Sequence, residues 1–128
     1  IGSAQQVRKG RKTALLVFGS LLGLTEAIAE ELDLSLVNMR FIKPLDESMV
    51  LQMAETHDYL VTLEDAAIAG GAGSAVLEYL NQQGLQVPLK RLGLSDDFPS
   101  HGSREQVLQE YGLDAEGIRQ SIMDFCKI

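Results

Sequence analysis

The sequence Thr13-Ala-Leu-Leu-Val-Phe18, followed by Gly19-Ser20, decides the fold class of this chain. A continuous apolar run of this length, closed by a turn former, is typical of a β-strand that is buried on both faces. Strands of that kind occur where helices cover both sides of a parallel sheet. The stretch therefore predicts a central strand of an α/β domain.

Helical periodicity and short apolar runs alternate along the rest of the chain. Leu24, Ile28 and Leu32 recur every four residues and predict one face of a helix. Further strands are predicted over residues 36–39, 59–63 and 87–92, and further helices after Asp46, after the glycine-rich loop 70–73, after Ser103 and after Asp114. This order indicates βαβ units with right-handed crossovers. We expect a three-layer α/β/α sandwich with a mostly parallel sheet of about four to five strands.

Local signals place several helix ends. Asp46 and Asp114 are good N-cap residues, and Ser103 with Gln106 forms a capping box. Gly84 is predicted as the glycine that follows the end of a helix. These signals are independent of hydrophobic periodicity, so they support the same element order by a second route.

Composition and charge exclude several classes of function. The 128 residues are 45% hydrophobic and 23% charged, with a net charge of −7. Residues 1–12 contain four basic side chains and no acidic one, so the rest of the chain is strongly acidic. An acidic body does not suit a nucleic acid partner, and no apolar run approaches the length of a membrane span. We interpret residues 1–12 as an interdomain linker and residues 13–128 as the domain.

The only cysteine, Cys126, excludes an internal disulfide and a multi-cysteine zinc site. It lies on the predicted inner face of the last helix with Ile118 and Ile122. We expect a small buried apolar residue there rather than a nucleophile.

The segment Gly70-Gly-Ala-Gly73-Ser74 could hold an anion, because it opens a predicted helix. Its spacing matches neither a P-loop nor a dinucleotide-binding motif, and Glu64 and Asp65 disfavour phosphate. A tight strand-to-helix turn is the favoured interpretation, and a ligand loop stays open. Adjacent acids at a strand end point to opposite faces, whereas a paired-carboxylate acid–base device needs both groups on one side. One of the two is therefore expected to cap a helix or to pair with Arg40, Lys43 or Arg91.

The two histidines have different settings. His57 is expected to be a surface or capping residue. His101 lies in a loop of turn-forming residues, 96–102, and is either a substrate or subunit contact or a hydrogen-bonded loop residue. A metal site from Asp96, Asp97 and His101, or a triad using Ser100 or Ser103, has no supporting spacing. No catalytic, cofactor-binding or metal-binding residue is predicted.

Several strings of the chain resemble, in order, the C-terminal domain of the transketolase superfamily, and within it the family of 1-deoxy-D-xylulose-5-phosphate synthases. The matching strings are Ala14-Leu-Leu-Val-Phe-Gly-Ser20, Val37-Asn-Met-Arg-Phe-Ile-Lys-Pro-Leu-Asp-Glu47, Leu63-Glu-Asp-Ala-Ala-Ile-Ala-Gly-Gly-Ala-Gly-Ser74, His101-Gly-Ser-Arg-Glu and Tyr111-Gly-Leu-Asp-Ala-Glu-Gly-Ile118.

The resemblance implies a cytoplasmic enzyme that uses thiamine diphosphate and Mg²⁺ to condense pyruvate with glyceraldehyde 3-phosphate. In that family the cofactor and catalytic residues belong to two other domains, and the C-terminal domain packs on them and helps bury a homodimer interface. This fragment alone is then expected to bind no cofactor and to be inactive. The contact candidates toward another domain or subunit are Glu64, Gly70, Gly71, Gly73 and His101.

Two alternatives remain at this point. The chain could be the corresponding domain of a transketolase or of a 2-oxoacid dehydrogenase beta subunit. It could also be a free-standing anion-binding α/β module that uses the glycine-rich loop.

Overall fold

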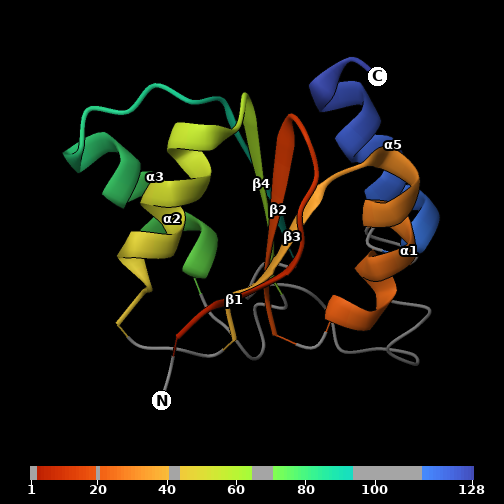
Figure 1. Ribbon diagram of the computed structural model, residues 1–128, viewed down its shortest axis with the longest axis horizontal. Coiled ribbons are helices and arrows are strands. Elements are labelled where there is room, and N and C mark those ends of the chain that lie inside the picture. The colour runs from red at the N-terminus through yellow and green to blue at the C-terminus, as the bar shows by residue number, and fades with distance from the viewer. Residues whose placement is uncertain (1–2, 20, 41–43, 65–70, 94–113) are drawn as a thin grey trace.

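The computed structural model describes residues 3–19, 21–40, 44–64, 71–93 and 114–128. Within these ranges the chain forms a five-stranded sheet between two pairs of helices (Figure 1). Along the chain the elements are β1 (Gln5–Arg8), β2 (Thr13–Phe18), α1 (Leu22–Leu32), β3 (Ser35–Asn38), α2 (Glu47–Thr56), β4 (Tyr59–Glu64), α3 (Ala72–Gln82), β5 (Leu89–Gly93) and α5 (Ala115–Cys126). The predicted three-layer α/β/α sandwich is confirmed.

The strand predicted from the opening apolar run, β2, lies at the centre of the sheet. The strand order is β1-β3-β2-β4-β5, and β2 pairs in parallel with both β3 and β4. Its residues Ala14, Leu15, Leu16 and Val17 are completely buried. The alternation of side chains sends Leu15 and Val17 to one face and Ala14 and Leu16 to the other. Burial on both faces explains why the run is continuously apolar.

Each face of the sheet has its own apolar core. Helices α1 and α5 cover one face, and α2 and α3 cover the other, as Figure 1 shows. Ile28 and Ile118 anchor the first core, and Val50 and Met53 anchor the second. On α1, the predicted helix face of Leu24, Ile28 and Leu32 does point to the core. Leu24 and Leu32 are only partly buried, so the fully buried part of this face is narrower than predicted.

The predicted helix caps are confirmed where the structure describes them. The Asp46 carboxylate accepts from the Met49 N–H at 3.1 Å, and the Asp114 carboxylate accepts from the Gly117 N–H at 3.0 Å. Gly84 has φ 70° and follows the last turn of α3. The N–H of the next residue, Leu85, donates to the Leu80 carbonyl, which completes a Schellman motif with Gly84. The helix predicted after Ser103 lies outside the described residues.

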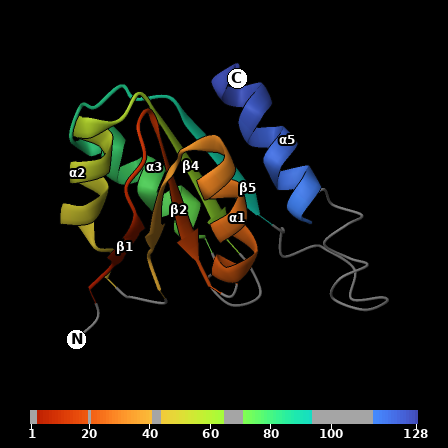
Figure 2. The ribbon, with the colours of Figure 1, turned by 45° about the vertical axis from the view of Figure 1, so that its right-hand side comes forward.

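The amino-terminal segment differs from its prediction as a linker over residues 1–12. Gln5–Arg8 forms the edge strand β1, antiparallel to β3, so the sheet begins before Thr13 (Figure 2). The sequence pattern is misleading because an edge strand is half-exposed and tolerates polar side chains. That this segment also joins the domain to a preceding one stays a prediction.

Contacts on both sides hold β1 in place. The Ala4 N–H donates to the Asp46 carboxylate at 2.8 Å, and the Arg8 guanidinium pairs with Asp33 at 3.0 Å. Gly10 passes so close to the backbone of residues 33–35 that an added Cβ would lie 2.3 Å from the Asp33 oxygen. The hydrogen bond from Ala4 lowers the pKa of the Asp46 carboxyl, with smaller contributions from Met49 and Ser48 against the opposing effect of burial.

Candidate functional site at the carboxyl edge of the sheet

The carboxyl ends of the parallel strands meet at one edge of the sheet, where ligands of α/β folds usually bind. In Figure 1 this is the lower edge, and the carboxyl terminus of the chain lies at the opposite, upper edge. The described residues there include Gly19 after β2, Arg40 after β3 and Glu64 at the end of β4. The amino-terminal end of α3 adjoins Glu64.

Glu64 caps helix α3. One carboxylate oxygen accepts from the Ala72 N–H at 3.0 Å, and the other accepts from the Gly73 N–H at 2.9 Å. These N–H groups belong to the first turn, where a helix has no internal acceptors for them and attracts negative charge. The prediction that one of the two acids caps a helix is therefore confirmed for Glu64.

The two described glycines of the turn serve different needs. Gly71 has φ 77°, a left-handed conformation that side chains rarely adopt. Gly73 lies against β4 and β5, because an added Cβ would meet the Thr62 hydroxyl at 2.9 Å and a Glu64 oxygen at 3.1 Å. The turn thus brings α3 close enough for the carboxylate to reach both N–H groups.

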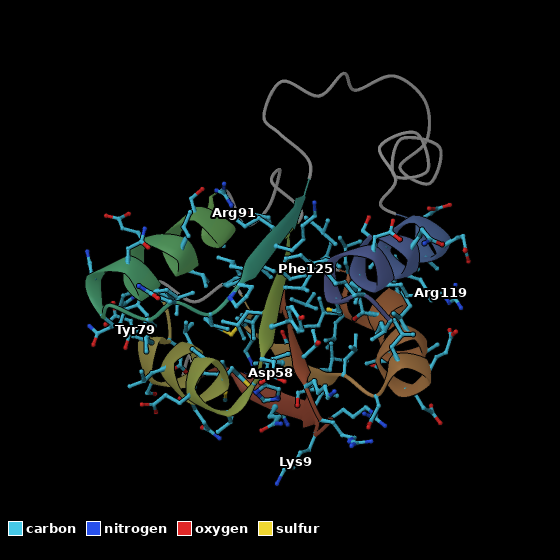
Figure 3. All side chains as sticks on the ribbon, turned by 90° about the horizontal axis from the view of Figure 1, so that it is seen from above. Lys9, Asp58, Tyr79, Arg91, Arg119 and Phe125 are labelled. Carbon is cyan, nitrogen blue, oxygen red and sulfur yellow. The ribbon has the colours of Figure 1, made fainter. Side chains whose placement is uncertain are left out.

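Arg91 and Thr62 complete this corner of the molecule. The Arg91 guanidinium, labelled in Figure 3, donates from β5 to the Ser74 hydroxyl of α3 at 3.0 Å. Thr62 is fully buried on β4, and its hydroxyl has no hydrogen-bond partner among the described residues. The sequence did not single out Thr62 or Ser74, since their roles depend on the approach of α3 to the sheet.

This arrangement answers the question that the glycine-rich loop left open. The N–H groups that could have held a phosphate already bind a carboxylate of the same chain. A second anion at the same N–H groups would meet repulsion from Glu64. The described part of the loop is therefore a strand-to-helix turn closed by its own acid, as the favoured interpretation held.

The structure describes only some of the other predicted residues. Gly70 and His101 lie outside the described residues, as do Lys43, Asp65, Asp96, Asp97, Ser100 and Ser103. His57 closes α2, and its Nδ1 lies 3.0 Å from the Met53 carbonyl oxygen, which confirms a capping role. Its Nε2 lies 2.7 Å from the Ser35 hydroxyl, which also accepts from the Gly10 N–H. The described residues contain no group of three potential metal ligands.

Cys126 is buried on α5, as predicted. Its Sγ lies 3.3 Å from the Thr13 hydroxyl. Burial raises the pKa of the thiol, and the contact with Thr13 opposes this rise. Phe125 beside it, labelled in Figure 3, packs edge-on against Tyr59, with ring centroids 5.5 Å apart. A thiol in this setting stays protonated and is a poor nucleophile.

A cavity of about 560 Å³ opens at the amino edge of the sheet, away from the glycine-rich turn. Its lining includes Thr13, Leu34 and Cys126, together with basic and acidic residues such as Arg11 and Asp58. The mixed charges favour no single class of ligand. None of the described helices is both long and apolar enough to cross a bilayer.

Comparison with known proteins places the chain in a family. The model of the family described as "Transketolase, C-terminal domain" matches residues 2–118. The chain belongs to this family. The matched range begins before β1, in agreement with the place of β1 in the sheet.

Curated relatives of the chain are named 1-deoxy-D-xylulose-5-phosphate synthase. The one from Thioalkalivibrio sulfidiphilus is 61% identical over 122 residues, and the one from Cellvibrio japonicus is 52% identical over the same length. Each alignment covers 95% of this chain but only 19% of the relative. The chain therefore spans about a fifth of the length of the curated relatives it matches.

A solved structure shares the fold at lower sequence identity. The "Split gene transketolase, inactive beta4 tetramer" superposes with a TM-score of 0.84 and is 23% identical. The match covers 98% of this chain and 43% of that chain. It confirms the transketolase C-terminal fold.

Proposed function

We propose that this chain is the C-terminal assembly domain of a 1-deoxy-D-xylulose-5-phosphate synthase. The full-length enzyme would condense pyruvate with glyceraldehyde 3-phosphate to give 1-deoxy-D-xylulose 5-phosphate and CO2, a precursor of isoprenoids, thiamine and pyridoxal phosphate. The observation that carries the proposal is the 61% identity to such a synthase over 95% of the chain. Identity at this level with synthases favours this family over transketolases and 2-oxoacid dehydrogenases.

The turn at Glu64 does not fit a diphosphate, and the described residues do not fit Mg²⁺. The N–H groups at the start of α3 already bind Glu64, so they are not free to hold a diphosphate. Mg²⁺ prefers clustered oxygen ligands, and the described residues contain no group of three such acids. We infer that the other parts of the full-length chain hold the cofactor and the reacting groups.

Assembly is the role that suits the domain in this scheme. Its proposed partners are the other two domains of its own chain and a second copy of the enzyme, in the cytoplasm. The contact surface would include Glu64 and Gly71, together with Gly70 and His101, whereas the predicted Gly73 is buried and would act by fixing the turn. A fixed turn at the edge of a sheet can be recognised by another domain with little loss of conformational entropy.

The test is a synthase assay on the full-length protein and on the 128-residue chain. Full-length protein with thiamine diphosphate and Mg²⁺ should convert pyruvate and glyceraldehyde 3-phosphate to 1-deoxy-D-xylulose 5-phosphate with release of CO2. The chain alone should be inactive and should show no thermal shift with thiamine diphosphate, Mg²⁺ and pyruvate. Transketolase activity of the full-length protein without synthase activity would overturn the proposal, as would a saturable shift of the chain.

The assembly role has its own test in the same protein. Gly71→Val strains the left-handed turn, and His101→Ala removes the loop imidazole. Both should weaken dimerisation and turnover, whereas Glu78→Gln on the exposed side of α3 should leave both unchanged. Wild-type dimerisation and turnover in both site variants would contradict the assembly role while leaving the family assignment intact.

A further inference from the structure

Backbone strain points to a residue outside the turn at Glu64. Among the described residues, three non-glycine residues have positive φ: Asp33, Arg40 and Lys127. Asp33 and Lys127 directly follow α1 and α5, and their N–H groups donate to carbonyls of the last turn. A left-handed residue is ordinary at a helix end. Arg40, with φ 59°, follows a strand instead.

Two contacts of the preceding residues hold Arg40 in this conformation. The Asn38 side-chain oxygen accepts from the Arg40 N–H at 3.0 Å. The preceding residue, Met39, donates its N–H to the Val17 carbonyl at 2.8 Å and buries its side chain in the core under α2 and α3. A left-handed backbone is costly for a residue with a Cβ, and such strain often marks a functional position.

The fixed backbone holds an exposed guanidinium at the carboxyl edge. In the described part of the chain its hydrogen bond goes to the neutral Gln5 side-chain oxygen of β1, at 3.1 Å. Two other arginines pair with acids: Arg8 with Asp33 at 3.0 Å and Arg119 with Glu31 at 2.7 Å. A guanidinium has five donors in a planar fork that matches a carboxylate. One bond to a neutral amide uses only part of this capacity.

We propose that Arg40 is a docking residue that binds a carboxylate side chain from another part of the full-length protein. This rests on the proposed function in so far as the chain is one domain of a longer enzyme. Its curated relatives are about five times longer, so most of the polypeptide lies outside this chain. Arg40 is exposed at this edge, which suits a protein surface better than an enclosed small ligand.

The experiment uses hydrogen exchange on the full-length protein. Arg40→Gln should speed exchange by about tenfold or more in the segment that carries the partner acid, which is the loss expected for one charge-assisted hydrogen bond. Arg40→Lys should be intermediate because it keeps the charge without the fork. Arg11→Gln, an exposed arginine at the opposite edge, is the matched control and should change nothing there.

A second variant separates docking from a local role. Arg40→Gly relieves the backbone strain and also removes the guanidinium. If Arg40 docks on a partner acid, Arg40→Gly should speed exchange in the partner segment as much as Arg40→Gln does. If Arg40 has a purely local role, Arg40→Gly should leave exchange at or below the wild-type rate. Reversing the charge of both Arg40 and the acid in that segment should restore protection.

Other outcomes would overturn the inference. Unchanged exchange outside this domain in Arg40→Gln would exclude docking, even in a fully active synthase. Protection that appears only with millimolar inorganic phosphate, and disappears in Arg40→Gln, would show a free anion in place of the carboxylate. If the wild-type protein has no synthase activity but protection of the partner segment still depends on Arg40, the proposed function is refuted and this inference stands.

Discussion

Replacing Glu64 by alanine removes the acceptor for two N–H groups at the start of α3. The two hydrogen bonds, of 3.0 Å and 2.9 Å, are lost together, and so is a negative charge next to the positive end of the helix. Loss of a helix cap costs about 0.5–2 kcal/mol, and loss of the charge costs about 0.3–1 kcal/mol. We therefore expect the free energy of unfolding to fall by about 1–3 kcal/mol.

The assay is urea unfolding of the chain at neutral pH, with the slope of the transition checked between variants. Glu64→Gln should lose about half as much as Glu64→Ala, since its amide keeps one acceptor oxygen. Glu78→Ala removes the same charge from the exposed middle of α3 and is the matched control. Hydrogen exchange at Ala72 and Gly73 should rise in Glu64→Ala and stay unchanged in Glu78→Ala.

Sulfate provides the sharpest check of the reasoning. With Glu64 removed, the N–H groups at the start of α3 become free to bind an added anion. Sulfate should then stabilise Glu64→Ala more than it stabilises the wild-type chain or Glu78→Ala. If Glu64→Ala and Glu78→Ala are equally stable, or if sulfate stabilises all three proteins alike, the carboxylate does not occupy an anion-binding helix end and the interpretation of the turn is wrong.

Three further predictions test other contacts. The hydrogen bonds of Asp46 lower the pKa of its carboxyl in the folded state. They stabilise the chain fully above the unfolded pKa, and this stabilisation is lost as the pH falls through the folded pKa. Asp46→Asn should therefore flatten the decline in unfolding free energy below about pH 4, and parallel curves of unfolding free energy against pH for the two proteins would contradict this. Gly10→Ala should lower the free energy of unfolding in urea by at least about 2 kcal/mol, because the added Cβ would collide with backbone atoms. Gly23→Ala, which has open space in a helix, should raise it by about 0.5 kcal/mol. Equal effects of the two substitutions would contradict the close packing of Gly10. Cys126 should react with iodoacetamide far more slowly in the folded chain than in urea, because burial raises its pKa, and equal rates would show an accessible thiol.

Much of the fold could be predicted because the deciding signals are local. A run buried on both faces needs apolar residues at every position, and β2 has them. As helix caps, Asp46 and Gly84 act within four residues of their own positions, so these capping roles follow from sequence spacing. β1 gave no such signal. Its place depends on pairing with β3 and on Gly10 fitting against residues 33–35, and these contacts are distant in sequence.

The candidate site was predictable only in outline. Glu64 and the glycines stood out by residue type, and a capping role was one of the alternatives. The choice between capping and pairing with an arginine depends on where α3 begins relative to β4, which the sequence pattern does not define. Arg40 shows a sharper limit, since its left-handed backbone comes from a bond to Asn38 and from the burial of Met39.

A glycine-rich turn before a helix indicates free N–H groups, but it does not identify the anion that they bind. In this chain the anion is the Glu64 carboxylate, so the interaction fixes the start of α3 on the end of β4. Arg40 is fixed at the same edge by a different device, a left-handed turn after β3. Two positions held rigidly at one edge lose little conformational freedom when a partner docks, and binding is stronger for that reason. Such preorganisation agrees with the assembly role that we propose for this edge, where the N–H groups at the start of α3 already bind Glu64.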